Sequence, residues 1–138
     1  MVGILLYYFV ILHIQISNLH MKNIVASKSY QFALRIISLY KLLAFERKEF
    51  VLSKQILRSG TAVGALIKEA EHAQSKPDFL NKMNIALKEI NETEYWLMLL
   101  RDSTFISIIE FDSIYPDCKE LIKLLASIVK TTKTSLQK

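Results

Sequence analysis

Glu69 and His72 are the residues whose types and spacing come nearest to a catalytic constellation. Di-iron helical bundles place a Glu and a His three residues apart on each of two helices, and two further helices each add an inward Glu. A centre of this kind needs a second such pair, but His72 is the only histidine beyond residue 20. The sequence therefore predicts no metal site, no cofactor, no small-molecule substrate and no enzymatic activity.

Cys118 is the other intrinsically reactive side chain, and it is the only cysteine. An internal disulfide is therefore excluded, and no histidine lies at zinc-ligand spacing. The separation of Cys118 from Ile114 and Leu121 places it on an apolar helical stripe, which predicts a buried, unreactive thiol. A lone reduced cysteine suits a reducing compartment, so we expect a cytoplasmic protein.

Positive charge is the remaining chemistry of the chain. Lys and Arg number 18 against 13 Asp and Glu, which gives a formal net charge of +5 and favours polyanionic partners such as RNA or DNA. Phosphate contacts need only loosely spaced cations, so such binding is salt-sensitive and weakly specific. The alternative is a solvated face, because glutamates alternate with the cations. The candidate phosphate contacts are Lys54, Arg58, Lys68, Lys76, Lys82 and Lys88.

The spacing of apolar residues predicts the elements that position these side chains. Three glycines and two prolines leave few turns, which favours long helices. Apolar residues recur every three or four positions in four segments, beginning near residues 27, 52, 77 and 111. Four amphipathic helices joined by short connections predict an all-α, antiparallel up-down four-helix bundle.

Local signals refine the ends of these helices. Ser75, Pro77 and Asp78 predict a capped helix start, and the charged residues 46–49 predict a short solvated connection. Pro116 lies inside the last apolar pattern, which predicts either a kink there or a helix start near Tyr115. Gly60 and Gly64 lie four residues apart within a helical segment. They predict close packing against a neighbouring helix, since glycine otherwise weakens a helix.

The N-terminus differs from the rest of the chain, so we divide it into an apolar extension, residues 1–24, and a bundle domain, residues 25–138. Val2 to Ile16 is apolar apart from His13 and Gln15, and no Lys, Arg, Asp or Glu precedes Lys22. The run is shorter than the roughly 20 residues of a spanning helix, and it lacks the features of a secretory signal. One hypothesis is that translation begins at Met21 and that residues 1–20 belong to the sequence only because the start codon was assigned too early. The alternative is a short membrane-associating anchor.

The block from Leu52 to Leu100 resembles the bacterial four-helix-bundle proteins first noticed as reading frames in intervening sequences of 23S ribosomal RNA genes. It is also similar to the accessory variability determinant of diversity-generating retroelements. Relatives usually have Asn where this chain has Leu66, and a small residue where it has Lys68. The most specific matching elements are Gln55, Arg58 and Ser59, then Val63 to Ala65, Glu69 and Ala70, Ala86 to Glu89, and Glu92 to Trp96.

The resemblance implies a non-enzymatic, closed homo-oligomer, typically a pentamer, with a basic surface for RNA or DNA. In the retroelement relatives it also implies a reverse transcriptase as protein partner. We expect Arg58 to be a phosphate contact or to pair with Glu69 or Glu94. Tyr95 and Trp96 either pack in the core or a subunit contact, or stack on unpaired bases. The structural or oligomer contacts expected are Gln55, Gly60, Gly64, Glu69, Glu94, Tyr95 and Trp96. A scaffold that binds proteins and no nucleic acid is the alternative function.

Overall fold

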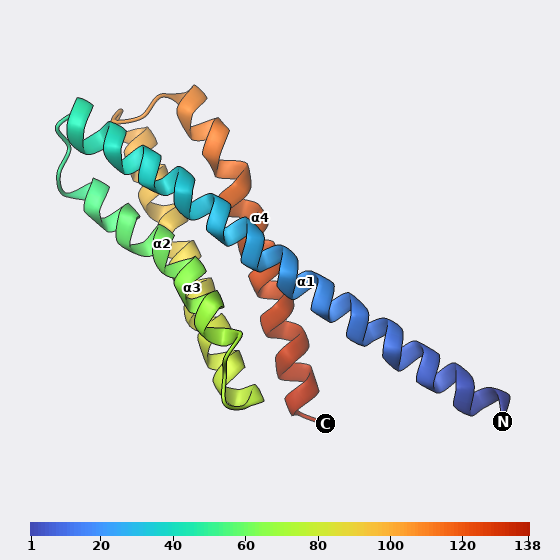
Figure 1. Ribbon diagram of the computed structural model, residues 1–138. Coiled ribbons are helices and arrows are strands. Elements are labelled where there is room, and N and C mark those ends of the chain that lie inside the picture. The colour runs from blue at the N-terminus through green and yellow to red at the C-terminus, as the bar shows by residue number, and fades with distance from the viewer.

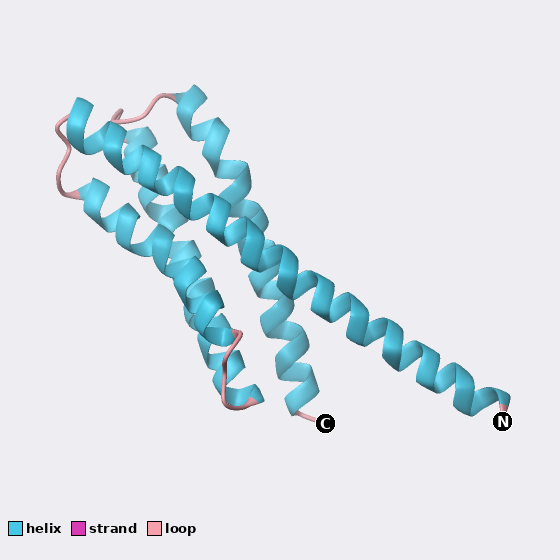
Figure 2. Ribbon diagram, in the orientation of Figure 1, coloured by secondary structure: helices cyan, strands magenta, loops and turns pink.

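The computed structural model describes residues 1–138 and contains four α-helices, one π-helical turn and no strand. Successive helices run in opposite directions, and α1 contacts both α2 and α4, so the four helices enclose one core (Figure 1). The connections lie at the ends of the bundle (Figure 2). The predicted all-α, antiparallel four-helix bundle is confirmed. The elements are α1 (Val2–Lys41), η1 (Leu42–Glu46), α2 (Leu52–Ala70), α3 (Lys76–Asp102) and α4 (Ile108–Leu136).

The core follows the predicted apolar stripes. Ile36 of α1, Ile56 of α2, Ile90 of α3 and Leu125 of α4 are fully buried and belong to one cluster. Burial of each such side chain contributes about 1.5–3 kcal/mol. Every predicted stripe residue of α4 is buried, including Cys118. Mutual burial of the stripes therefore holds the helices in place.

The helix α1 is longer than the predicted first helix. It runs without a break from Val2 to Lys41, and its first buried residue is Val25. The half of α1 before this residue projects away from the bundle (Figure 1). The division at residues 24 and 25 therefore falls inside a continuous helix, next to its first fully buried residue.

The structure corrects two predictions about helix ends in part. The connection at residues 46–49 is not fully solvated, because Glu49 is only 8% exposed. Its carboxylate accepts hydrogen bonds from the amides of Leu52 at 2.9 Å and Ser53 at 2.6 Å, and so caps α2. The start near Tyr115 is also wrong, since α4 begins at Ile108 and continues through Pro116. By contrast, Ser75 caps α3 as predicted, with its hydroxyl accepting from the amide of Asp78 at 3.2 Å.

The hydrogen bonds at Glu49 affect its acidity. Burial alone would raise the pKa of this carboxyl, but the amides of Leu52, Ser53 and Val51 outweigh burial, and the pKa is lowered. The ionised form is therefore the one that caps α2. A helix whose first amides meet an anion is stabilised at its positive end.

Candidate nucleic-acid interface

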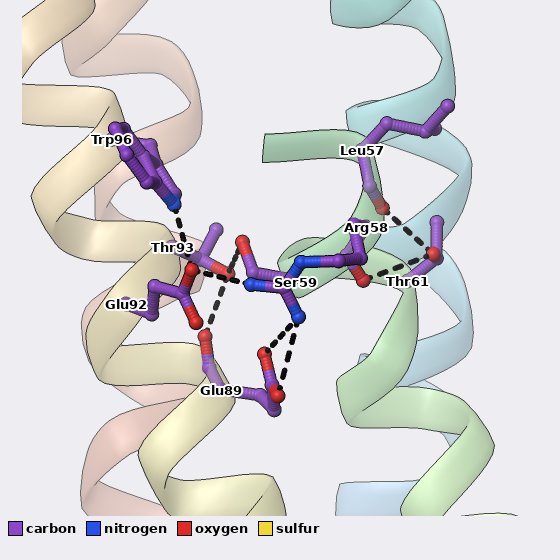
Figure 3. Close-up of polar contacts among 8 residues, drawn as sticks. All are labelled: Leu57, Arg58, Ser59, Thr61, Glu89, Glu92, Thr93 and Trp96. Atoms are coloured by element: carbon purple, nitrogen blue, oxygen red, sulfur yellow. Dashed lines mark hydrogen bonds and ion pairs between the residues drawn. The ribbon is translucent and has the colours of Figure 1, made fainter. Parts of the chain in front are cut away.

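Arg58 lies on the exposed face between α2 and α3, where it bridges Glu89 and Glu92 (Figure 3). Its Nη1 is 3.1 Å from Glu89 Oε2, and its Nη2 donates to Glu92 Oε1. The indole Nε1 of Trp96 donates to the same Glu92 oxygen at 3.1 Å. The Arg58 hydrogen bond is the main reason that the pKa of Glu92 is lowered.

The partners of Arg58 thus differ from the predicted Glu69 and Glu94. Because α2 and α3 are antiparallel, Arg58 lies opposite residues 89–92, and Glu69 lies opposite Lys82. Lys82 Nζ is 2.9 Å from Glu69 Oε2. Glu94 faces α4 instead, where it accepts from the Tyr115 hydroxyl at 2.9 Å and from Lys119 Nζ at 3.2 Å.

The predicted basic strip is consequently interrupted by carboxylates. Arg58 and Lys82 are paired as described, and Lys68 lies 3.4 Å from Glu71. Lys76 donates to the Ser135 hydroxyl at 3.0 Å. Lys54 and Lys88 are exposed, and neither has a carboxylate within 4.0 Å. The strip therefore carries much less uncompensated charge than its composition indicates.

The predicted structural residues occupy two environments. Trp96 is half-buried against the core, whereas Tyr95 is 55% exposed and meets Trp96 edge to face at 5.1 Å between ring centroids. Gln55 is also exposed. Trp96 therefore contributes to packing within the chain, and Tyr95 and Gln55 are accessible for contacts outside it.

Gly60 and Gly64 face α1. A Cβ atom at Gly60 would lie 2.8 Å from a Cγ atom of Ile36, and one at Gly64 would lie 3.5 Å from the carbonyl oxygen of Ser29. Only Gly60 therefore excludes a larger side chain on steric grounds. The neighbour that requires this glycine is a side chain rather than the backbone.

Uncompensated positive charge is concentrated where sequence reasoning did not place it. Every arginine forms an ion pair, whereas many lysines have no carboxylate partner. After Glu120, α4 contains no acidic residue, and Lys123, Lys130 and Lys133 are all exposed. Spacings of seven and three residues put these three on one helix face. The absence of Asp and Glu from residues 121–138 is the feature of the sequence that could have predicted this basic face. The lysines without a carboxylate within 4.0 Å are Lys22, Lys41, Lys48, Lys54, Lys76, Lys88, Lys123, Lys130, Lys133 and Lys138.

Neither His72 nor Cys118 belongs to a cluster of metal-binding side chains. The structure brings together no group of three His, Cys, Asp or Glu side chains able to hold a metal ion. Cys118 is fully buried, and burial raises the pKa of its thiol to about 12. A thiol of this kind is protonated at neutral pH and unreactive, so the prediction of a buried, unreactive thiol is confirmed.

These features define the class of protein: a small antiparallel four-helix bundle with ion-paired arginines, unpaired surface lysines and a continuous apolar core. The family model described as 23S rRNA-intervening sequence protein matches residues 21–127, and the chain belongs to this family. The resemblance seen in the sequence is thereby confirmed.

A solved structure supports the same assignment. The chain is similar to a protein of unknown function from the S23 ribosomal protein family of Bacteroides thetaiotaomicron, with 59% identity and a TM-score of 0.78. The similarity covers 80% of this chain and 98% of that one. No curated protein matches the chain.

Proposed function

We propose that this protein is a non-enzymatic, oligomeric accessory protein of the cytoplasm that binds nucleic acid through unpaired lysines. The observation that carries the proposal is the exposed face of Lys123, Lys130 and Lys133 on α4, where no carboxylate competes for the ammonium groups. Lysine acts as a point charge toward phosphate. Binding to the backbone of RNA or DNA, with little sequence preference, follows from this chemistry.

Self-association completes the proposal, with a pentamer as the expected assembly. Several large apolar side chains are exposed at the end of the bundle where η1 leads into α2 and α3 leads into α4. Arg47 joins these two connections, since it donates to the carbonyl oxygen of Phe105 and pairs with Glu110 at 2.7 Å. A contact with another copy would cover these side chains. They are Phe45, Phe50, Val51, Ile108 and Ile109.

The nucleic-acid proposal is tested by measuring affinity for RNA and for DNA at several salt concentrations. The logarithm of the binding constant should fall linearly with the logarithm of salt concentration. Substitution of Lys123, Lys130 and Lys133 by Ala should reduce the magnitude of this slope by about 2–3, since each phosphate contact contributes about 0.7–0.9.

The matched control replaces three ion-paired lysines, Lys28, Lys68 and Lys119, by Ala. It removes the same formal charge and should change the slope less. Equal effects of the two variants would assign binding to net charge alone and contradict the α4 site. Absence of binding at low salt by a folded oligomer would reject nucleic-acid binding altogether.

A protein scaffold is the second candidate function, and the exposed apolar end of the bundle is the observation that favours it. This candidate predicts a protein partner whose retention is insensitive to nuclease and is lost in Ile109→Lys. Light scattering on the same variant separates the two uses of the surface, because a contact between copies would appear as a loss of mass.

A further inference from the structure

The first half of α1 exposes an apolar surface that nothing in the chain covers. We call residues 2–20 the N-terminal arm. Its side chains are exposed, for example Val2 at 82% and Phe9 at 66%, except those of Ile11 and Asn18, which are half-buried, and none is fully buried. Its large apolar residues are Val2, Ile4, Leu5, Leu6, Tyr7, Tyr8, Phe9, Val10, Ile11, Leu12, Ile14, Ile16 and Leu19.

The distribution of these residues around the helix indicates whether the arm is suited to a protein groove or to lipid. A helix that docks into a protein groove has one apolar stripe and a polar opposite face. The arm has apolar side chains on every face from Val2 to Leu12, apart from Gly3. A helix that is apolar all round is suited to a core or to lipid, and the bundle provides no core around it.

We propose that the N-terminal arm inserts into a lipid bilayer and holds the bundle at the membrane surface. The arm contains no Lys, Arg, Asp or Glu. With a rise of about 1.5 Å per residue, its uninterrupted apolar part from Val2 to Leu12 is about 16 Å long, which is about half of the roughly 30 Å of the hydrocarbon layer.

Charge at the base of the arm fits an anionic lipid surface. Lys22 is the first cationic side chain, and its Nζ lies 4.5 Å from the centroid of the Phe79 ring. Lys76, at the start of α3, lines the same pocket as Asn18 and Lys22, together with Ser135 of α4 and Glu71, whose carboxylate pairs with Lys68. Cations on the bundle side of an apolar helix attract anionic headgroups and favour a cytoplasmic bundle.

The polar residues of the arm lie in the half nearest the bundle. His13, Gln15, Ser17, Asn18 and His20 all follow Leu12. Insertion with the N-terminus leading places them near the headgroups and leaves the uninterrupted apolar part in the hydrocarbon. The sequence order thus agrees with the charge at the base of the arm.

Comparison with the family separates the arm from the bundle. The family match begins at residue 21, and 98% of the solved relative is covered by 80% of this chain. The family match therefore lies entirely outside the arm. The chain beginning at Met21 is accordingly a suitable control for the role of the arm.

The test is flotation of the full-length chain with vesicles of phosphatidylcholine, with and without phosphatidylglycerol. The full chain should float with both kinds of vesicle, and more completely with the anionic vesicles. The chain beginning at Met21 should not float with the neutral vesicles. Phe9→Lys should lower partition onto the neutral vesicles roughly a hundredfold, because a charged side chain in the hydrocarbon is strongly disfavoured. Tyr30→Lys, which makes the same kind of change at an exposed aromatic residue of α1 outside the arm, should float like the unmodified chain on the neutral vesicles.

Three results would overturn the proposal. The full chain could remain with the vesicle-free fraction, or Phe9→Lys could float as well as the unmodified chain. Cells could also contain only protein that begins at Met21, which mass spectrometry of N-terminal peptides in the membrane fraction would reveal. A soluble assembly held together by the arms would appear as vesicle-free protein with a higher mass than the chain beginning at Met21.

Discussion

At the scale of single residues, the structure divides the cations into two groups. Arg35, Arg47 and Arg58 join helices or connections through carboxylates, and Arg101 pairs with its neighbour Asp102. By contrast, Lys123, Lys130 and Lys133 of α4 face solvent without a carboxylate partner. An exposed pair such as Arg58 with Glu89 contributes little to stability, typically up to about 1 kcal/mol. The arginines are therefore occupied by carboxylates on the surface of the bundle, and the unpaired lysines are the side chains available to a polyanion.

Gly60 gives a prediction at the same scale. In Gly60→Ala the new Cβ would lie 2.8 and 2.9 Å from the two Cγ atoms of Ile36, which is fully buried and has little room to move. Strain of about 1–3 kcal/mol should exceed the gain in helix propensity of up to about 1 kcal/mol. Urea unfolding should therefore show a net loss of stability.

Gly64→Ala is the matched control for this substitution. Its Cβ would make only ordinary contact, with 3.5 Å to the nearest atom. The same gain in helix propensity should then leave stability unchanged or raised by up to about 1 kcal/mol. Equal changes for both variants would show that α1 yields at Gly60 as easily as at Gly64.

At the scale of elements, carboxylates stabilise the N-termini of α2 and α4. The carboxylate for α2 comes from before the helix, and the one for α4 comes from its first turn. Glu49 caps α2 from three residues before Leu52. Ser107 and Glu110 form a reciprocal capping box at α4, with Ser107 Oγ accepting from the Glu110 amide at 3.1 Å. Arg47 pairs with this glutamate and so ties the start of α4 to the connection after η1. The Glu110 carboxylate therefore both caps α4 and, through its ion pair with Arg47, clamps the start of α4 to the connection after η1.

Glu110 gives a pH prediction for this clamp. The hydrogen bond from Arg47, followed by the Ser107 amide, lowers the pKa of Glu110 to about 2 from its usual 4.5. Because the folded pKa is depressed, the stabilisation is fully present above about 4.5 and is lost as pH falls toward 2. After allowance for solvent screening, about 1 kcal/mol should disappear over this range.

The measurement is the free energy of unfolding between about pH 6 and about pH 1 for the protein and for Glu110→Gln, a range that extends beyond both the unfolded and the folded pKa. The variant should be less stable near neutral pH, and the difference should vanish at the acidic end. Asp112→Asn, which alters an exposed carboxylate without an ion-pair partner, is the control. A constant difference at all pH values would show that the Glu110 charge has no role in the clamp.

At the scale of the whole molecule, the bundle and the N-terminal arm are energetically separate. The bundle buries a closed core between four helices, and α1 contributes no buried residue before Val25. The arm adds exposed apolar surface and no contact with that core. Its role therefore lies in what it meets outside the chain.

This separation predicts that the arm adds little to the stability of the bundle. The chain beginning at Met21 should unfold in detergent-free buffer with a thermal midpoint within a few degrees, roughly 1 kcal/mol in stability, of the full chain in mild detergent. Circular dichroism at 222 nm, the usual helix signal, provides the measurement. A much lower midpoint for the shorter chain would show that the arm supports the core.

The sequence by itself determined the number and inward faces of the helices and their approximate limits, apart from the start of α1. The apolar stripe that includes Ile90 and Leu97 predicts a buried helix face, and Ser75 to Asp78 predict a helix start. Both signals are visible in the sequence because they depend only on residues within one segment. These local patterns also excluded a di-iron centre, for which the necessary second histidine is absent.

Only the tertiary structure decided which charges meet. Whether Arg58 pairs with Glu69, Glu89, Glu92 or Glu94 depends on the register between antiparallel helices, which no local pattern in the sequence records. The same register neutralises Lys82 and leaves Lys130 free. Charge compensation acts over a few ångströms between segments distant in the chain, and for that reason the surface open to a polyanion emerged only from the fold.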